Sequence, residues 1–247
     1  MERVLIIPDL HFPEHDPKAL AVALAAARAI KPDRTVVLGD FLDCAQFSGH
    51  PPKCIEEART TSWADDLAGA GSVLDKLLAC TKGELAFVEG NHEKRISKWA
   101  ANSVAGRAVH DLVAPSVVFG RKKRLRYIKH GPRAHYKVAP NLLAVHGWSV
   151  GAGALRKHLQ LSKSYSVVFG HVHRCGLETD RDLDDRVIEA WSPGFLAKHQ
   201  PYWLESNPSG WTQGVGLVYV NGQRHQSFPI PIDGYQCVLP SGKLIRL

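Results

Sequence analysis

Acidic, histidine and asparagine side chains recur directly after short apolar runs along the first two-thirds of the chain. Each run is about four residues long and rich in Val, Leu and Ile, which is typical of a buried strand. The polar clusters that follow these runs are Asp9 and His11, Asp40 and Asp43, Asn91 and His92, His146, and His171 and His173. Because the ligand crevice of an open α/β sheet lies at the carboxyl ends of its strands, we expect these side chains to converge on one site.

The residue types in these clusters are those of a site for two divalent metal ions. Such a pair can hold a phosphate and generate a bridging hydroxide as the nucleophile, so no serine or cysteine nucleophile is needed. We expect Asp40 to bridge the ions, since a carboxylate has one oxygen for each. The remaining ligands divide into Asp9, His11 and one histidine of the 171/173 pair around one ion, and Asn91, His146 and the other histidine around the second.

Local sequence supports this arrangement in three ways. The alternation in His171-Val172-His173 predicts that both imidazoles lie on one side of an extended backbone. Glycines precede Asp40, Asn91 and His171 and allow the chain to turn sharply near the ions. His92 lies beside a proposed ligand and is free to protonate the leaving oxygen as a general acid.

The segments between the clusters predict an α/β alternation followed by a β-rich tail. We expect strands at 4–7, 35–38, 85–88, 142–145 and 166–169, and helices at about 17–30, 62–79, 93–113 and 154–160. Asp16 is the expected N-cap of the first helix, with Pro17 at its first position. Further strands are expected near 187–191, 216–220 and 226–230, and Asn221-Gly222 indicates a hairpin.

Composition is that of an ordinary soluble globular protein. The hydrophobic fraction is 45% and the charged fraction 22%, and 247 residues without a linker-like segment favour one domain, 1–247. No apolar stretch is long enough to span a bilayer, and the N-terminus leads straight into the first strand rather than into a secretory signal. The five cysteines are odd in number and irregularly spaced, which predicts reduced thiols in a cytoplasmic protein.

The charge of the chain favours an anionic partner. The net charge is +7, and one segment, 121–133, is strongly basic. Its four consecutive cations are Arg121, Lys122, Lys123 and Arg124. The segment is either a solvated loop or hairpin, or a surface that contacts a phosphate backbone, where Tyr127 could stack on a base.

The order DxH, GDxxD, GNHE, H and GHxH over about residues 4–173 resembles the motif set of the calcineurin-like metallophosphoesterase superfamily. The resemblance implies a sandwich of two mixed β-sheets flanked by helices, with the tail at about 187–247 completing the second sheet. It implies that His92 is the catalytic histidine and that Asp43 hydrogen-bonds His92 and orients it. It implies metal ligation by Asp9, His11, Asp40, Asn91, His146, His171 and His173.

One branch of the superfamily, the Ser/Thr protein phosphatases, differs from this chain in its motifs, which argues against a protein phosphatase activity. Ser/Thr protein phosphatases have Asp-Arg-Gly where this chain has Asp43-Cys44-Ala45, so their phosphate-binding arginine is missing. Arg95 and Arg174 lie next to ligand motifs and either bind the substrate phosphate or form salt bridges at the rim of the site. Cys44 and Cys175 flank motifs whose ligand set is already complete, so we expect them to pack rather than to bind metal.

The expected function is therefore that of a divalent-metal-dependent phosphodiesterase or nuclease acting on nucleic acid. A small-molecule phosphatase, a cyclic-nucleotide phosphodiesterase and a non-catalytic binding module on the same scaffold remain alternatives. Manganese is the preferred metal, and zinc, iron, nickel or magnesium would also suit oxygen and nitrogen ligands.

Overall fold

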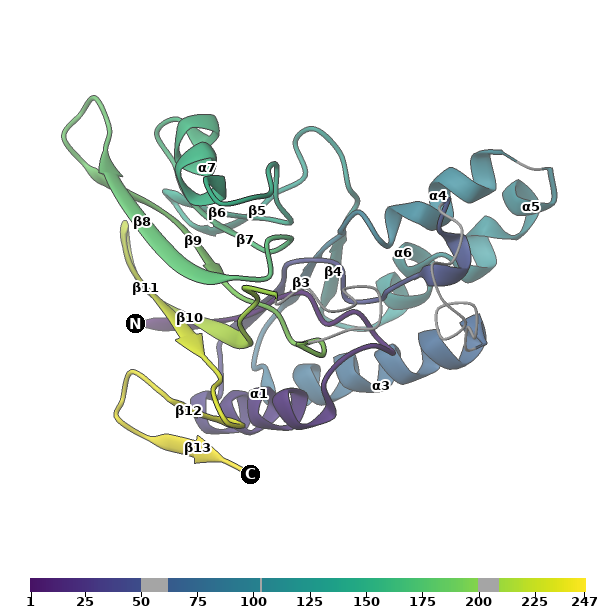
Figure 1. Cartoon of the computed structure of the whole chain (residues 1–247), viewed down its shortest axis with the longest axis horizontal. Coiled ribbons are helices and arrows are strands. Elements are labelled where there is room, and N and C mark those ends of the chain that lie inside the picture. The colour runs from purple at the N-terminus through teal and green to yellow at the C-terminus, as the bar shows by residue number, and fades with distance from the viewer. Residues whose placement is uncertain (50–61, 103, 200–208) are drawn as a thin grey trace.

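Two mixed β-sheets pack face to face, and helices cover their outer faces (Figure 1). This computed structural model describes residues 1–49, 62–102, 104–199 and 209–247. The expected fold class, a single-domain sandwich of two mixed sheets flanked by helices, is confirmed.

The first sheet has six strands in the order β11-β10-β1-β2-β3-β4. Its bounds are β1 (Glu2–Ile7), β2 (Arg34–Val37), β3 (Leu85–Val88), β4 (Leu125–Ile128), β10 (Gly214–Asn221) and β11 (Arg224–Pro231). Strands β1 to β4 are parallel, and β10 runs antiparallel to β1. The four parallel strands therefore end at the same edge of the sheet.

The second sheet has five strands in the order β5-β6-β7-β9-β8. Its bounds are β5 (Tyr136–Ala139), β6 (Leu142–Val145), β7 (Ser166–Phe169), β8 (Cys175–Arg181) and β9 (Val187–Pro193). Strands β6, β7 and β9 are parallel. A separate two-stranded ribbon is formed by β12 (Gln236–Val238) and β13 (Leu244–Arg246).

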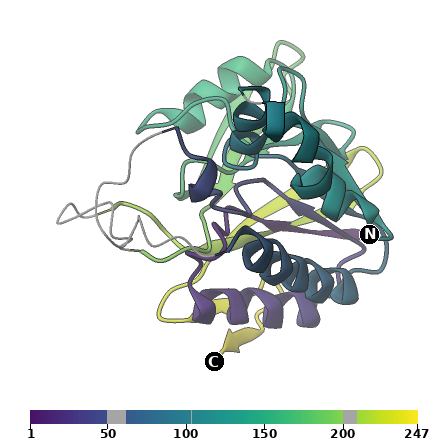
Figure 2. The same ribbon diagram turned by 90° about the vertical axis from the view of Figure 1, so that its right-hand side faces the viewer.

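Helices α1 (Pro17–Ile30) and α3 (Trp63–Cys80) lie side by side on the outer face of the six-stranded sheet (Figure 2). Helix α7 (Ala154–Ser162) covers the outer face of the other sheet. The remaining helical segments are α4 (Lys94–Ala101), α5 (Val104–Val113), α6 (Pro115–Val118), η1 (Ala45–Phe47) and η2 (Phe119–Arg121).

Alternation along the strands explains the layers. In β1, Leu5 and Ile7 pack into the core beneath α1 and α3, whereas Val4 and Ile6 face the other sheet. All four side chains are at most 1% exposed. Parallel strands that are buried on both faces read as continuous apolar runs, which is why the sequence marked β1, β2, β3, β6 and β7 so clearly.

The first helix starts as expected, since the Asp16 carboxylate accepts the amide protons of Lys18 and Ala19 at 2.9 and 3.2 Å. The single helix expected at 93–113 is wrong, because α4 ends at Ala101 and α5 begins at Val104. Strands β4, β5 and β8 were not expected either; β4 and β8 are edge strands with mostly half-exposed or exposed side chains, so their apolar pattern is weak.

The expectation that the tail completes the second sheet is correct only for β9. Strands β10 and β11 instead extend the six-stranded sheet beside β1. The reason is that β10 is buried on both faces: Leu217 packs into the helix-side core and Val218 into the core between the sheets. The β10–β11 hairpin expected at Asn221-Gly222 is confirmed, with Asn221 paired to Arg224.

Two expectations about the whole chain concern cysteines and membranes. Cys44, Cys80, Cys175 and Cys237 are free thiols, and Cys54 lies outside the described residues. Within the described ranges, each helix is too short or too polar to cross a bilayer.

Candidate metal centre

The five polar clusters lie at the carboxyl ends of β1, β2, β3, β6 and β7. Because the two sheets pack face to face, these strand ends lie near one another and the clusters meet. In the part of the chain that the structure describes, three groups of carboxylate and imidazole side chains have ligand atoms within 4.8 Å of one another. The groups are Asp9, His11 and His173; Asp40, His146 and His171; and His11, Asp43 and His92.

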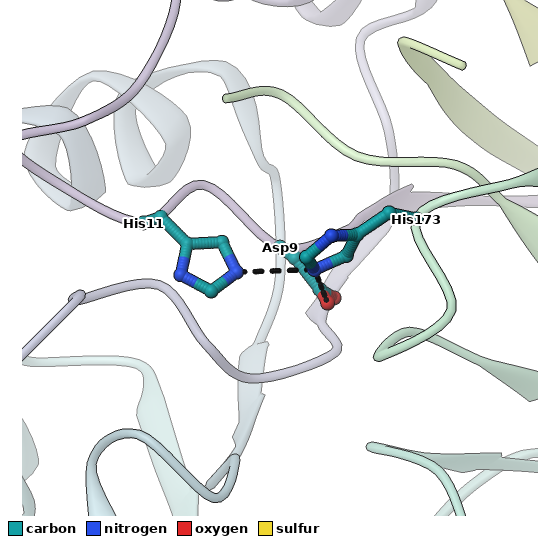
Figure 3. A group of neighbouring side chains, drawn as sticks. All are labelled: Asp9, His11 and His173. Carbon is teal, nitrogen blue, oxygen red and sulfur yellow. Dashed lines mark hydrogen bonds and ion pairs between the residues drawn. The ribbon is translucent and has the colours of Figure 1, made fainter. Parts of the chain in front are cut away.

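The first group joins the loops after β1 and β7 (Figure 3). The Nε2 atoms of His11 and His173 are 3.1 Å apart, and the Nε2 of His173 is 3.1 Å from Asp9 Oδ2. Asp9 Oδ1 is buried and has no hydrogen-bond partner among the described residues. A buried carboxylate oxygen without a partner is costly, so a cation in this group would satisfy it.

The second group joins the loops after β2, β6 and β7. The Nδ1 of His146 lies 2.8 Å from the Leu38 carbonyl and donates to it, which directs Nε2 toward the group. This Nε2 is 2.8 Å from Asn91 Oδ1 and 3.2 Å from Asp40 Oδ2. Because Asp40 Oδ1 accepts the amide proton of His92 at 2.9 Å, Oδ2 is the atom left to face the metal centre, and the expectation of one free oxygen for each ion is not met.

The electrostatic potential of this group favours cations. Burial lowers the pKa of His146, but the negative charge of Asp40 and its hydrogen bond outweigh burial and raise the pKa to about 10. Burial raises the pKa of Asp40 itself, yet the nearby imidazoles hold it well below the usual range. The same carboxylate charge would attract a metal ion, whose binding would release the proton. The residues present therefore fit two divalent cations.

His92 belongs to the third group, and its Nε2 is 3.8 Å from Asp40 Oδ2 of the second group. Its Nδ1 is 2.7 Å from the Asp43 carbonyl oxygen and 3.3 Å from Asp43 Oδ1. The same Asp43 carboxylate lies 3.1 Å from Nδ1 of His11. Asp43 therefore contacts a proposed ligand as well as the proposed catalytic histidine.

Arg95 contacts the other side of the His92 ring. Its Nη2 donates to His92 Nε2 at 3.0 Å, and its Nη1 donates to the Asp43 carbonyl at 2.9 Å. The structure thus places Arg95 on the catalytic candidate. Arg174 is exposed and forms no ion pair with any described residue; its guanidinium lies against Gly210.

Glu93 was not identified as a site residue from the sequence, although it is the last letter of the GNHE motif. It is 1% exposed, and its hydrogen-bond donors among the described residues are backbone amides. Oε1 accepts from Phe41 and Leu42 at 2.7 and 2.9 Å, and Oε2 accepts from Asp40 and Gly90 at 3.0 and 2.9 Å. Burial and the charge of Asp40 raise the pKa of Glu93 to about 7. One side chain therefore joins the loops that carry Asp40 and Asn91.

The backbone at the ligands is not extended, so the expectation for His171-Val172-His173 is wrong. Both histidines have left-handed conformations, with φ of 68° and 55°, and so do His11 (51°) and Asp40 (44°). Such φ values are rare for residues with a side chain and cluster at functional sites. Turning of the chain at each histidine directs His173 to the first group and His171 to the second.

Aromatic rings line the centre next to His173. Phe195 stacks on this imidazole at 5.1 Å and Trp211 meets it edge-on at 4.6 Å. Phe195 follows Gly194 directly after the end of β9. Cys44 and Cys175 belong to none of the ligand groups found among the described residues, in keeping with a packing role. Trp203, which could pair with Trp211 in a flap or loop, lies outside the described residues.

The basic segment has partners within the protein. Arg124 donates to the carbonyls of Leu78, Thr81, Lys82 and Gly83 at the end of α3, and Lys122 pairs with Asp75 at 2.6 Å. These cations precede β4, whereas the metal centre follows the carboxyl ends of the strands. They are thus separated from the centre by at least the length of β4, roughly 13 Å.

Tyr127 is not available for stacking on a base. Its ring stacks on Phe87 at 4.9 Å, and its hydroxyl donates to Glu89 at 3.0 Å. Burial raises the pKa of Tyr127 well above its ordinary value.

The sandwich fold and a histidine- and carboxylate-rich centre at the strand ends define a metallophosphoesterase. The family model for calcineurin-like phosphoesterases (Metallophos) matches residues 2–175, and the chain belongs to this family.

Relatives of similar length are distant in sequence. The chain is 24% identical over 246 residues to the "Gene 54 protein" of Mycobacterium phage D29, and the match covers 94% of each chain. Among solved structures it resembles Vps29 of Chaetomium thermophilum, with a TM-score of 0.50, 13% identity and coverage of 99% of this chain and 90% of that one. The E. coli phosphoesterase Yfce gives a TM-score of 0.43 at 15% identity, with coverage of 98% and 96%.

Proposed function

We propose that this protein is a phosphoester hydrolase that binds two divalent metal ions and acts on phosphodiesters, with nucleic acid as the substrate that its charge favours. The observation that carries the proposal is the convergence of two ligand groups from different strands. One contains the unpartnered Oδ1 of Asp9, and the other contains Asp40 Oδ2 facing His146.

The residues of the centre have distinct roles in this proposal. Asp9, His11 and His173 would hold one ion, Asn91, His146 and His171 would hold the other, and Asp40 would be shared. When bound, such ions polarise the phosphate and make a water molecule more acidic. Oxygen and nitrogen ligands of this kind suit Mn²⁺, the preferred metal, as well as Zn²⁺, Fe²⁺, Ni²⁺ or Mg²⁺.

His92 is the proposed proton donor to the leaving oxygen. Asp43 accepts from Nδ1, so the proton to be transferred must be carried on Nε2. In the structure, Arg95 donates to that Nε2. We infer that Arg95 turns from His92 to the substrate phosphate, which frees Nε2 and gives the phosphate a bidentate partner. We propose Arg174, which follows His173 in the sequence, as the second arginine that contacts the phosphate.

The metal proposal is tested by elemental analysis together with hydrolysis. Protein loaded with Mn²⁺ should hold close to two equivalents and hydrolyse bis-p-nitrophenyl phosphate. Asp40→Asn should lose more than one equivalent, whereas Asp65→Asn, an exposed carboxylate on α3, should lose none. No more than one ion at saturating Mn²⁺ would contradict the dinuclear centre. Full occupancy without hydrolysis of any phosphoester would favour the binding-module alternative.

The nucleic-acid proposal is supported by the net charge of +7 and by the exposed Arg121 and Lys123. Changing both to Ser should weaken polynucleotide binding and reduce the slope of log K against log salt by about 0.9 for each lost duplex contact. Lys122 and Arg124 are left unchanged because Lys122 pairs with Asp75 and Arg124 donates to carbonyls at the end of α3. The control exchanges Lys243, just before β13, and Arg246, within β13, which removes the same amount of charge from exposed positions. If both double variants bind the polynucleotide equally well, Arg121 and Lys123 do not contact the substrate and belong to a solvated surface.

A further inference from the structure

A cavity of about 290 Å³ adjoins the metal centre on the side of the second ligand group. Its walls come from the ends of β3 and β6, from the loop between β4 and β5 and from the start of α4, and His146 lines both the cavity and the centre. Much of the lining is apolar, including Val88, Val145, Pro132 and Ala134. A group joined to a phosphate in the metal centre can therefore enter this cavity.

Trp148 presents an anchored aromatic surface to the cavity. The residue is 42% exposed, and its ring stacks on His158 at 5.4 Å with an interplanar angle of 14°. His158 is buried and stacks on Phe169 at 3.6 Å. The Trp148 amide donates to His158 Nε2 at 2.9 Å, while His158 Nδ1 donates to the Ala154 carbonyl at 2.7 Å. One ring face is thus supported while the side chain keeps an exposed surface.

Polar groups stand beside this ring. Lys94 Nζ is 3.2 Å from His130 Nδ1. An ammonium group can only donate, so His130 accepts at Nδ1, and a neutral imidazole then carries its proton on Nε2. The cavity therefore offers a cation and one ring N–H donor next to an aromatic platform.

We propose that this cavity binds the nucleoside part of a phosphoester substrate, with its base stacked on Trp148 and its phosphate in the metal centre. The inference rests on the proposed phosphoesterase function and specifies the substrate of that site. A planar heteroaromatic ring fits an exposed indole, and polar base edges fit Lys94 and His130. The volume is at the lower end for ligand pockets, so it accepts one nucleoside at a chain end or in a nucleotide, not a duplex.

Calorimetric titration of the Mn²⁺-loaded protein with thymidine and adenosine 5′-monophosphates, and with inorganic phosphate, tests the proposal. The nucleotides should bind more tightly than phosphate. Trp148→Ala should raise the nucleotide Kd relative to the phosphate Kd by roughly 5- to 150-fold, the equivalent of about 1–3 kcal/mol for base stacking. Tyr165→Ala is the control, because Tyr165 is similarly exposed but lies just before the amino end of β7, whereas the metal centre lies at the carboxyl end. This variant should keep the wild-type ratio of the two Kd values.

Trp148→Phe guards against loss of the His158 stack, since phenylalanine retains a stacking surface and should recover most of the nucleotide affinity. Equal nucleotide-to-phosphate ratios in wild type and Trp148→Ala would overturn the proposal. A kinetic comparison separates it from the proposed function. The p-nitrophenyl ester of thymidine 5′-monophosphate should be preferred over methyl p-nitrophenyl phosphate, and Trp148→Ala should reduce that preference. If nucleotide affinity depends on Trp148 but neither ester is hydrolysed, the proposal of nucleoside binding in the cavity stands and the proposed hydrolase function is refuted.

Discussion

Exchange of Glu93 for Gln tests how the metal-binding loops are held. The change keeps the shape of the side chain and replaces one carboxylate oxygen with an NH₂ group. Each oxygen of Glu93 accepts two backbone amide protons, and all four partners are donors. Whichever way the new amide lies, its NH₂ group faces two N–H groups, so two buried donors lose their acceptor.

The cost follows from those two donors. A buried donor left without a partner costs about 1–3 kcal/mol, so Glu93→Gln should lose about 2–6 kcal/mol of unfolding free energy. That is a large share of the roughly 5–15 kcal/mol that stabilises a typical protein. For a chain of this length, 1 kcal/mol shifts Tm by about 2–4 °C, so the melting temperature should fall by at least about 4 °C. Because the amides belong to the loops of Asp40 and Asn91, Mn²⁺ affinity should fall as well.

Glu89→Gln is the matched control. Glu89 is also buried, but it accepts from the Tyr127 hydroxyl and from only one amide, that of His130. A glutamine there can accept from the amide and donate to the hydroxyl, which can turn to accept, so the loss should stay near 1 kcal/mol or below. Both variants are measured by urea unfolding and by Mn²⁺ titration. A Glu93→Gln variant as stable as Glu89→Gln would refute the reasoning.

For two further substitutions the structure determines the direction of the change in metal affinity or stability. Asp43→Asn should lower Mn²⁺ affinity as well as turnover, because the carboxylate contacts both His11 and His92; Mn²⁺ titration that leaves affinity unchanged would contradict this. Asp33→Asn should show a pH-dependent loss of stability. The hydrogen bond from Lys82 is the largest cause that lowers the pKa of Asp33 to about 2, so its contribution is full above the ordinary value of 3.8 and is lost as pH falls toward 2. Urea unfolding should therefore show a deficit of about 1–2 kcal/mol at pH 7 that shrinks between pH 4 and pH 2, and a constant deficit would exclude this linkage.

The residues that converge at the centre could be predicted from the sequence because each cluster is local. Each ligand cluster directly follows an apolar strand, as Asp9 follows β1 and His146 follows β6. Strand, residue type and order along the chain are all visible without contacts, and they sufficed for the fold class and the family. Edge strands such as β4 and β8 escaped because one or both of their faces lack a continuous apolar pattern.

Contacts between distant residues were decided only by the tertiary structure. Glu93 joins an amide 51 residues away, and His173 rather than His171 meets His11 because both histidines adopt left-handed conformations. The placement of Arg124 on the carbonyls that end α3 likewise depends on how β4 pairs with β3. Hydrogen-bond partners and stacked rings depend on packing in three dimensions, whereas residue spacing reports only on neighbours along one strand or helix.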